Sequence, residues 1–222
     1  MGPRSGRGRI FLACIVLFVD LIGAHTNARA GCEVTSVIGA DPSLANSEAV
    51  VWIGRSWNQV FTATDTLVKS LTVWRPARND SMYFPIKLYV LEVDSSFGLQ
   101  RPNPKGIVLD APDIVVPGSG GIDPIKVQWV FDPPLALPHR GQFAFQVKED
   151  LCGGSFALLS SSNDVYAGGD VWRTDPNVGC VGAGCCPTQY SYARDLVFSI
   201  EFCDSPVATG SQTWGRVKSI FR

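Results

Sequence analysis

IKVQWVFDPPLALPHRGQFAFQVK, residues 125–148, is the stretch that decides the fold class of this chain. It contains two runs in which apolar and polar residues alternate, separated by a proline-rich connection at 132–141. The apolar members of the two runs are Ile125, Val127, Trp129, Phe131, Phe143, Phe145 and Val147. A period of two, with aromatic and β-branched residues on one side, is typical of strands half-buried against a core. Since the prolines favour neither a central strand nor a helix, we expect two strands that form one wall of an antiparallel β-sandwich.

Short apolar runs recur along the rest of the chain. They predict strands at 32–38, 49–53, 57–63, 67–74, 86–93, 107–109, 114–116, 156–160 and 196–202. Residues 86–93 are apolar on both faces, which is typical of a central strand. Residues 95–106 are expected to form a long hairpin loop, and residues 163–192 a surface loop cross-linked by disulfides. About ten short strands without a convincing helix indicate an all-β antiparallel β-sandwich of jelly-roll type over residues 31–203.

Residues 1–30 have the three parts of a secretory signal peptide. Three arginines precede an apolar run at 10–22, interrupted only by Asp20, and Ala28-Arg29-Ala30 is a small-x-small site. We predict cleavage before Gly31 and a secreted or cell-surface mature chain. The alternative, a membrane anchor, is disfavoured because the run is shorter than the roughly 20 residues that span a bilayer. We expect no transmembrane segment in the mature chain.

The charge of the mature chain excludes one class of partner. Removing residues 1–30 takes four arginines and one aspartate from 19 basic and 20 acidic residues, which leaves 15 and 19 and a net charge of −4. Nucleic-acid binding needs clustered lysines and arginines, and the sequence has no such cluster outside its tail. We therefore expect no nucleic-acid partner.

Cysteine usage agrees with export. Six cysteines remain once Cys14 leaves with the signal peptide: Cys32, Cys152, Cys180, Cys185, Cys186 and Cys203. An even number in an exported chain predicts three disulfides. Cys32 begins the first predicted strand and Cys203 ends the last, so we predict a bond between them, and a second bond from Cys152 to a cysteine of the 163–192 loop. A zinc site at the loop cysteines is the alternative, but there is no C-x-x-C pair and His139 is the only histidine left.

Five segments together resemble a known kind of module. They are NQVFTATDTLVKSLTVW, IKLYVLEVD, WVFDPPLALPHRGQFAFQV, FALLSSSNDVYAGGDVWR and DLVFSIEF. In this order they resemble the jelly-roll modules of bacterial secreted and cell-surface proteins, of the choice-of-anchor kind, which are similar in fold to carbohydrate-binding modules. The resemblance covers residues 47–203 and its motifs are structural. It implies a jelly-roll fold and a polysaccharide or cell-surface component as partner.

Sugar binding needs an exposed aromatic ring and a few polar groups. Trp172, Tyr166 and Tyr190 lie in the predicted loop, where exposure and function concentrate, and Trp74 follows the polar face of its strand. We propose these four as candidate ligand-binding residues. Trp129 is expected in the core, and core packing is also the preferred interpretation of Trp52 and Trp57, since a tryptophan buries a large area.

Calcium is the cofactor most compatible with this composition. Calcium takes six to eight oxygen ligands, and Asp164, Asp170 and Asp175 lie in a glycine-rich loop that could supply some of them. The alternative is that these aspartates stabilise turns through their own backbone. No EF-hand spacing decides between the two.

Enzyme signatures are absent from the sequence. There is no G-x-S-x-G elbow, H-E-x-x-H pair, P-loop or Rossmann glycine pattern, and His139 lies in the proline-rich connection. We therefore predict a non-catalytic, carbohydrate-binding-like module. A structural or adhesive surface protein without a small ligand is the alternative. A glycan-active enzyme that uses two carboxylates ranks third.

The C-terminus differs from the rest of the chain. Residues 204–213 are predicted to be a linker and residues 214–222 an amphipathic basic tail. Its apolar residues fall at helical spacing, but it is too short for a stable isolated helix, so it docks on another surface or stays disordered. It resembles the short sorting signals that end in Trp-Gly, Lys and aromatic-Arg on other exported bacterial proteins. The alternative is a tail that lies on its own sandwich.

Overall fold

The computed structural model describes eight segments of the chain. They are residues 32–52, 55–77, 84–116, 123–149, 155–174, 189–191, 195–204 and 218–221, without the side chains of 84, 97, 189–191 and 218–221. The predicted signal peptide, four of the six cysteines of the predicted mature chain, Asp175 and nearly all of the predicted linker lie outside these segments. No helix in the described segments is long and apolar enough to cross a membrane.

One wall of the molecule is a five-stranded antiparallel sheet. Its strands, in spatial order, are β1 (Val34–Gly39), β14 (Phe198–Cys203), β4 (Leu67–Arg75), β8 (Ile125–Ala136) and β15 (Lys218–Phe221). β4 and β14 pair over most of their lengths, with Leu71 opposite Ile200. The first strand and the last strand of the described chain therefore form the two edges of the same sheet.

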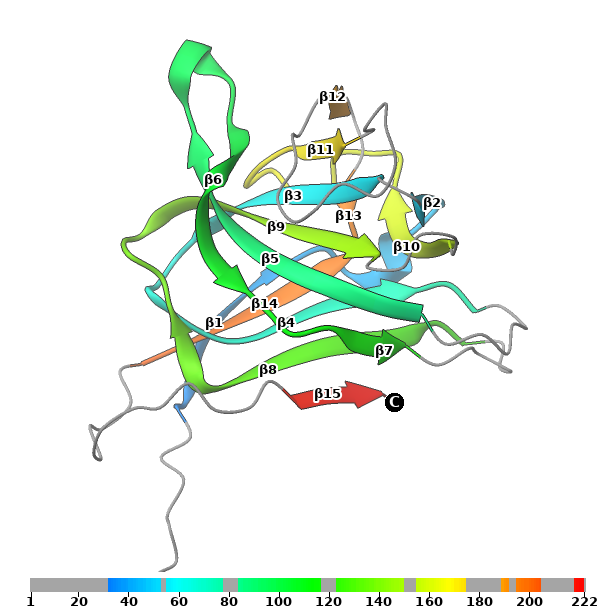
Figure 1. Ribbon diagram of the computed structural model, residues 1–222, viewed down its shortest axis with the longest axis horizontal. Helices are drawn as coiled ribbons and strands as arrows, with labels where there is room; N and C mark the ends of the chain where they lie inside the picture. The colour runs from blue at the N-terminus through cyan, green and yellow to red at the C-terminus, as the bar shows by residue number, and fades with distance from the viewer. Residues whose placement is uncertain are drawn as a thin grey trace, which may run out of the picture.

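The opposite wall is a seven-stranded antiparallel sheet (Figure 1). Its strands, in spatial order, are β12 (Gln189–Ser191), β11 (Val171–Thr174), β3 (Ser56–Ala63), β9 (Gly141–Glu149), β5 (Phe84–Asp94) and β6 (Arg101–Asp110), while β7 (Ile114–Val116) pairs with β5 beside β6. β5 and β6 continue beyond the sheet as a protruding hairpin (Figure 1), which a short 3-10 turn, η2 (Ser96–Gly98), closes.

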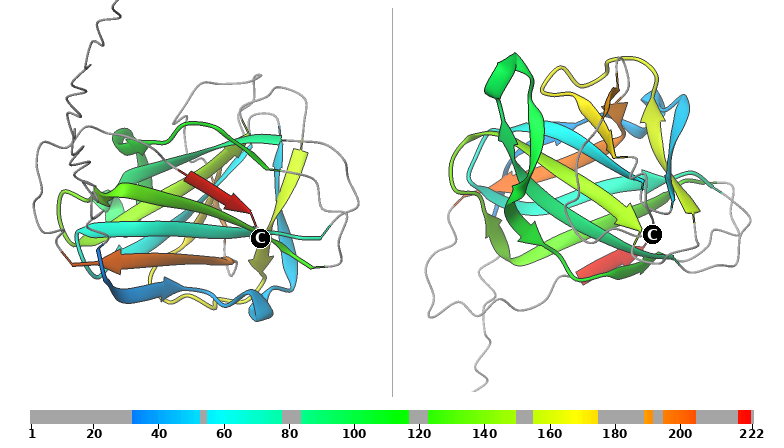
Figure 2. Two further views of the ribbon diagram at one scale, coloured as in Figure 1. Left: turned by 90° about the horizontal axis from the view of Figure 1, so that it is seen from below. Right: turned by 45° about the horizontal axis from the view of Figure 1, so that its top comes forward.

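A smaller sheet lies at one end of the sandwich. It consists of β13 (Asp195–Leu196), β10 (Ser155–Ser161) and β2 (Ser47–Trp52), and the 3-10 turn η1 (Pro42–Leu44) precedes β2. Figure 2 shows β2 and β10 side by side at this end. The predicted strand at 196–202 is therefore divided, because the chain leaves the small sheet and enters the five-stranded sheet at Val197.

The core lies between the two large sheets. The inward side chains of β4, β8 and β14 face those of β3, β5 and β9 in one continuous apolar cluster. Trp129 is fully buried there, as predicted, and the rings of Phe145 and Phe198 meet across the two sheets with centroids 5.2 Å apart. Burial of this kind supplies the main favourable free energy of folding. The prediction of an antiparallel β-sandwich is confirmed, and the jelly-roll connectivity stays a prediction.

The proline-rich connection has a different role from the one predicted. β8 lies in the five-stranded sheet and β9 in the seven-stranded sheet, so the two runs belong to opposite walls and not to one. β8 also continues through the prolines to Ala136. The pairing register jumps there from Ser70 opposite Val130 to Val68 opposite Leu135. Since the prolines fall inside this bulge, their missing N–H groups remove no ladder hydrogen bond.

Two other loop predictions were too long. β6 begins at Arg101, so half of the expected 95–106 loop is a strand. Pro102 lies opposite Val93, and Pro104 falls in the bulge between this pair and the Leu91–Ile107 pair. Residues 163–192 contain β11 and β12. The central strand expected at 86–93 is confirmed by β5, which pairs with β9 and β6 and buries residues of both faces.

A disulfide joins the two ends of the sandwich. Cys32 bonds to Cys203 with 5.5 Å between the Cα atoms, which confirms the predicted pairing. The bond closes a loop with a sequence separation of 171 residues, and the chain-entropy model gives about 5 kcal/mol of stabilisation for a loop of this size. The remaining predicted disulfide residues, Cys152, Cys180, Cys185 and Cys186, lie outside the described segments.

Four residues of the predicted tail form a strand. Lys218–Phe221 are β15, which pairs antiparallel with residues 127–130 of β8. This part of the tail therefore lies on its own sandwich, as a strand along β8 (Figure 2, left). The sorting-signal interpretation stays a prediction.

Candidate functional site

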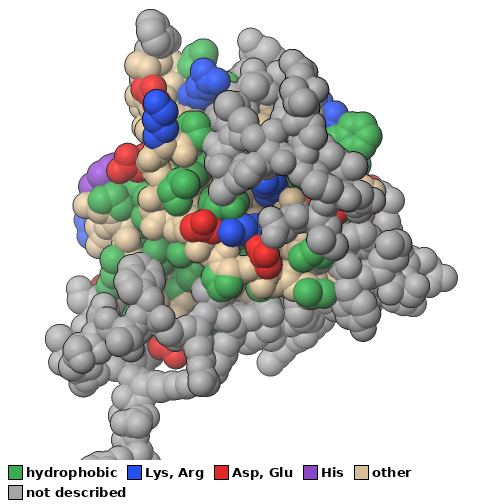
Figure 3. All heavy atoms as spheres, viewed as in Figure 1, with side chains coloured by type: hydrophobic (Ala, Val, Ile, Leu, Met, Phe, Trp, Pro, Cys, Tyr) green, Lys and Arg blue, Asp and Glu red, His purple; other side chains and the backbone are tan. Residues whose placement is uncertain are grey.

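The candidate site is a polar pocket beside the protruding hairpin. We call residues 162–170 the pocket loop; this loop follows β10 and approaches the base of the hairpin (Figures 1 and 2). The pocket encloses about 240 Å³. Its lining residues are Thr62, Gln100, Gln142, Asp164, Tyr166, Ala167, Gly168, Gly169 and Asp170. Figure 3 shows side chains of both charges along the hairpin, but none of the residues that line the pocket is basic.

The floor of the pocket is set by two neighbouring strands. Thr62 of β3 lies opposite Gln142 of β9. Their neighbours Phe61 and Phe143 are fully buried in the core. Because side chains alternate across a strand, Thr62 and Gln142 must point to the outer face. The core therefore fixes the direction of both floor residues.

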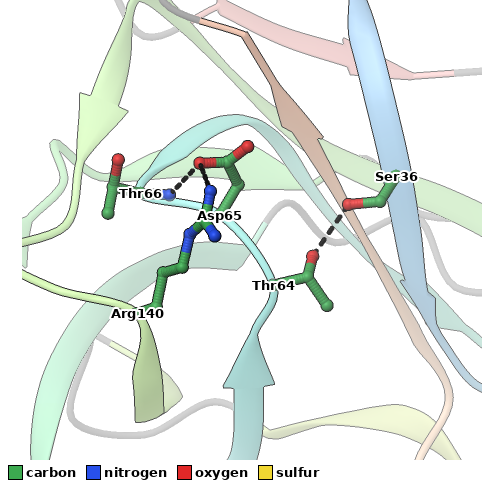
Figure 4. A network of polar contacts seen from close by, with 5 residues as sticks. All are labelled: Ser36, Thr64, Asp65, Thr66 and Arg140. Atoms are coloured by element: carbon green, nitrogen blue, oxygen red, sulfur yellow. Dashed lines mark hydrogen bonds and ion pairs between the residues drawn. The ribbon is translucent and has the colours of Figure 1, made fainter.

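Polar contacts hold the turns next to this floor. Asp65 accepts a hydrogen bond from the Thr66 backbone N–H at 2.8 Å and forms an ion pair with Arg140 at 3.4 Å. These residues join the β3–β4 turn to the β8–β9 turn (Figure 4). Thr64 also shares a 2.8 Å hydrogen bond with Ser36 of β1. An exposed ion pair contributes little to stability, so its effect here is to fix the relative position of the two turns.

Asp195 anchors the pocket loop from below. Its Oδ2 accepts hydrogen bonds from the backbone N–H groups of Val165 and Tyr166 at 2.7 and 2.9 Å. Its Oδ1 accepts from Gln59 Nε2 at 3.2 Å, and Gln59 Nε2 also donates to the Gly169 carbonyl at 3.1 Å. The Gln59 Oε1 accepts from the Leu196 N–H at 2.8 Å. Two buried polar side chains thus bind the middle of the loop and its C-terminal part to β13 and β3.

Burial changes the acidity of this anchor. It raises the pKa of Asp195 above the ordinary value of 3.8, and the hydrogen bonds from Tyr166, Val165 and Gln59 act in the opposite direction. Nearby Asp164 also raises the pKa of Asp195. The carboxylate form is needed to accept all three hydrogen bonds. The loop is therefore held by a group whose charged form is partly disfavoured by its surroundings.

Tyr166 forms one wall of the pocket and is half-buried. Its ring meets Phe198 edge to face at 4.9 Å, and its hydroxyl oxygen accepts a hydrogen bond from the Thr62 N–H at 3.2 Å. Thr62 Oγ1 in turn donates to the Gly168 carbonyl at 2.8 Å. Burial raises the pKa of Tyr166, so its hydroxyl stays protonated and can donate to a ligand.

The glycines of the pocket loop are required by close approaches. A Cβ at Gly168 would lie 2.4 Å from Tyr166 Cζ, and one at Gly169 would lie 2.5 Å from the carbonyl oxygen of Val60. Val60 donates its N–H to the Asp170 carbonyl at 2.9 Å. The Tyr-Ala-Gly-Gly motif therefore allows the loop to pack directly over the tyrosine ring and over β3.

The structure brings together three of the predicted site residues and separates the others. Tyr166, Asp164 and Asp170 line the same pocket. Trp74 is half-buried and lines a different, mainly apolar pocket of about 300 Å³ with residues of β1 and η1. Tyr190 belongs to β12, opposite Trp172, and its side chain lies outside the described part of the structure.

Trp172 does not have the exposure that was expected of it, and its contact with a ligand stays a prediction. Its side chain is only 4% exposed and packs with Val60 and Ala144 on the outer face of the seven-stranded sheet. Residues 171–174 form β11, which pairs with β3 and brings Trp172 opposite Asn58. The pairing of this short segment with β3 places the ring against the sheet and not in solvent.

Trp52 and Trp57 differ from one another. Trp57 is buried, as predicted, and donates its Nε1–H to the Val50 carbonyl at 2.9 Å. Trp52 is 49% exposed, against the prediction of core packing. The Arg55 guanidinium lies over its ring at 4.8 Å. Trp52 thus provides the exposed tryptophan surface that was expected of Trp172, but it does not line the polar pocket.

The calcium prediction stays open. Within the described residues, no group of three or more His, Cys, Asp and Glu side chains is arranged to hold a metal ion. Asp164 and Asp170 line the pocket, while Asp175 lies outside the described segments. Because calcium also uses backbone and amide oxygens, Asp164 and Asp170 remain the residues with which to test it.

Three pocket residues were not anticipated from the sequence. Gln100 comes from the hairpin, and Thr62 and Gln142 come from β3 and β9. The strand period does place Thr62 and Gln142 on the outer face, but no local pattern indicates that the pocket loop reaches them. His139 contributes nothing to the pocket; its Nδ1 contacts the Arg140 carbonyl at 2.9 Å.

Comparison of the chain with protein-family models, with curated proteins and with solved structures gives no match.

Proposed function

We propose that this chain is a secreted, non-catalytic β-sandwich module that binds a neutral carbohydrate in the polar pocket. The observation that carries the proposal is the composition of the lining: amides from Gln100 and Gln142, carboxylates from Asp164 and Asp170, and the hydroxyl groups of Thr62 and Tyr166. Amides and hydroxyls both donate and accept hydrogen bonds, as sugar hydroxyls do. A partly exposed tyrosine edge supplies limited apolar contact.

The charge of the pocket lining restricts which class of sugar can bind. The lining has two carboxylates and no Lys, Arg or His. A uronic or sialic acid would place like charges side by side with no cation between them, which disfavours binding. The pocket is smaller than the ~300 Å³ at which pockets for drug-sized ligands begin. We therefore expect one terminal, neutral sugar unit to enter it.

The disulfide supports an extracytoplasmic location. Disulfides persist mainly in oxidising compartments, and the Cys32–Cys203 bond closes the whole sandwich. This agrees with the predicted signal peptide at 1–30, and cleavage before Gly31 can be tested by N-terminal sequencing of the exported protein.

A glycan array tests the binding proposal. Wild-type protein should bind neutral glycans in preference to acidic ones. Gln142→Ala should weaken binding about 2- to 10-fold, the loss of one neutral hydrogen bond, and Gln100→Ala should act similarly. Gln128→Ala, on the outer face of the five-stranded sheet where Gln128 donates to Ser70, is the matched control and should bind normally.

Two results would contradict the proposal. One is an array on which the wild-type protein binds no glycan, and the other is binding that neither glutamine substitution in the pocket changes. Repeating the array with calcium and with a chelator tests whether calcium takes part in binding. If calcium bridges the ligand to Asp164 and Asp170, the chelator should abolish binding and Asp164→Asn should reproduce the loss.

A structural or adhesive surface protein is the second candidate. The burial of Trp172 removes the most prominent aromatic platform from solvent, and the hydrogen bonds of Asp195 and Gln59 bind the pocket loop into the fold. Both features favour a stable structural domain. This function predicts that the wild-type protein gives no signal on the array.

A further inference from the structure

The C-terminal strand is the least secured element of the five-stranded sheet. β15 is four residues long and, among the described strands, pairs only with β8, from Lys218 opposite Val130 to Phe221 opposite Val127. β8 is 12 residues long, so β15 pairs with only a third of its edge. A four-residue ladder has few backbone hydrogen bonds, and the net contribution of each is small. β15 can therefore leave β8 far more easily than an interior strand can.

The Cys32–Cys203 disulfide limits how far the release of β15 can spread into the sandwich. Cys203 is the last residue of β14 and is bonded to Cys32, and β14 pairs with both β1 and β4. Release of β15 therefore cannot spread into β14. The sandwich stays intact with the edge of β8 open, and an open strand edge is a template for another strand.

The segment that joins β14 to β15 is much longer than the distance between these two strands requires. β14 and β15 lie three positions apart in the sheet, about 14 Å at the usual strand spacing. They run antiparallel, since three antiparallel pairings separate them. The end of β14 and the start of β15 are thus on the same side of the sheet. The 14 residues between them can span roughly 46–50 Å, enough to reach a neighbouring molecule.

We propose that β15 is an exchangeable strand, and that the edge of β8 at residues 127–130 is a site for β15 of a second copy of this chain. The second copy is the occupant because it carries the same four residues and can form the same register. The exchange breaks and remakes identical pairings. The exchange therefore forms no new contact, and its extent depends on the protein concentration. This inference does not depend on the carbohydrate proposal.

Concentration sets the extent of exchange. A linker of about this length gives its own strand an effective concentration of about 1 mM. At a protein concentration of ~0.1 mM, about one chain in ten should then hold the β15 of another. Crowding on a surface would raise that fraction. Assembly between copies would accordingly be favoured where the protein is dense and absent where it is dilute.

Site-directed cross-linking of the full-length chain tests the proposal. One preparation carries Val130→Cys and another carries Lys218→Cys, the two register partners. They are mixed from about 0.01 to about 1 mM, concentrations that bracket the expected effective concentration, and are then mildly oxidised. A heterodimer on a non-reducing gel should increase in proportion to concentration. Replacing Ser219 and Ile220 by proline in the second preparation should abolish it, because one of two adjacent N–H groups faces β8.

Two controls decide the interpretation. Ser70→Cys mixed with Val130→Cys uses another pair of register partners, but both lie in strands that do not exchange, so no heterodimer should form. A single chain with both Val130→Cys and Lys218→Cys reports pairing within one molecule. If this chain closes internally while mixed chains never cross-link, β15 stays on its own sandwich and the proposal is wrong. If it does not close, β15 does not occupy β8 and the proposal also fails.

Discussion

The sandwich interior and the pocket loop are both well ordered, but different forces hold them. In the interior, Trp129 and its neighbours are excluded from water by apolar side chains of the opposite sheet. In the pocket loop, order comes from hydrogen bonds to Asp195 and Gln59, both of them buried. The interior is destabilised when side-chain volume is removed from its close packing. The pocket loop is destabilised when one of its hydrogen-bond acceptors is removed. The comparison shows that apolar burial holds the interior, whereas buried hydrogen bonds, together with the contact of Tyr166 with Phe198, hold the candidate binding surface.

The largest effect is expected in the interior. Trp129→Ala should lower the free energy of unfolding by about 3–5 kcal/mol, because a large side chain is removed and the cavity closes only partly. Chemical denaturation measures the change. Trp52→Ala is the matched control: it removes the same side chain from a half-exposed position, and the free energy should change by less than about 1 kcal/mol. Equal losses for the two variants would contradict this description of the core.

A smaller loss is expected on the outer face of the seven-stranded sheet. Trp172→Ala should cost about 3 kcal/mol, the lower end for tryptophan truncation, because Trp172 packs against the small side chains of Val60 and Ala144. Glycan affinity measured below the unfolding transition should stay near the wild-type value. A folded variant with full stability and no glycan binding would restore the original prediction that Trp172 contacts the ligand.

The anchor of the pocket loop can be removed without touching the core. Asp195→Asn replaces one acceptor oxygen by an amide that faces the donating Gln59 Nε2. We expect a loss of about 1–3 kcal/mol, the usual cost of leaving buried polar groups unsatisfied. Hydrogen exchange should show faster opening of the Val165 and Tyr166 amides, while amides of β4 and β14 stay protected. Uniformly faster exchange would mean that loop and interior are one unit.

The smallest expected effect is a pH dependence of the folding stability that originates from Asp195. Burial raises the pKa of Asp195 in the folded state, so the folded protein binds this proton more tightly than the unfolded chain does. The Asp195 contribution to stability should rise as the pH falls through the raised pKa and level off below the ordinary value of 3.8. Asp41 and Asp94, whose pKa values hydrogen bonds lower, act in the opposite sense. The difference in melting temperature between wild type and Asp195→Asn isolates the Asp195 contribution. A difference that is constant with pH would contradict it.

Strand periodicity predicted the interior because it reports which face of a strand meets the core. It predicted the burial of Trp129, Phe143 and Phe145 correctly. It could not tell which sheet a strand joins, because alternation is the same in both walls. The assignment of β8 and β9 to one wall failed for this reason, since the chain changes sheet in the turn between Ala136 and Gly141, and only the partner strands reveal that change.

The pocket was predictable only where its residues lie together in the sequence. Asp164, Tyr166 and Asp170 share one glycine-rich segment and were identified. Gln100 and Gln142 reach the same pocket from distant strands, and no single-segment pattern contains that information. The burial of Gln59 was equally hidden, because its acceptors and donors come from β13 and the pocket loop. Trp172 was misassigned because its glycine-rich surroundings obscured a four-residue strand.

The Cys32–Cys203 bond also determines how the molecule responds to mechanical load. Both cysteines lie at the outer limits of the sandwich, and their Cα atoms are 5.5 Å apart. Tension applied to the chain before Cys32 and after Cys203 would pass across the sulfur–sulfur link. It would bypass every strand between the two cysteines. β15 follows Cys203 and lies outside the link, so tension on the C-terminal segment would first pull β15 from β8. While the sulfur–sulfur link is intact, this pull could not extend the chain between Cys32 and Cys203.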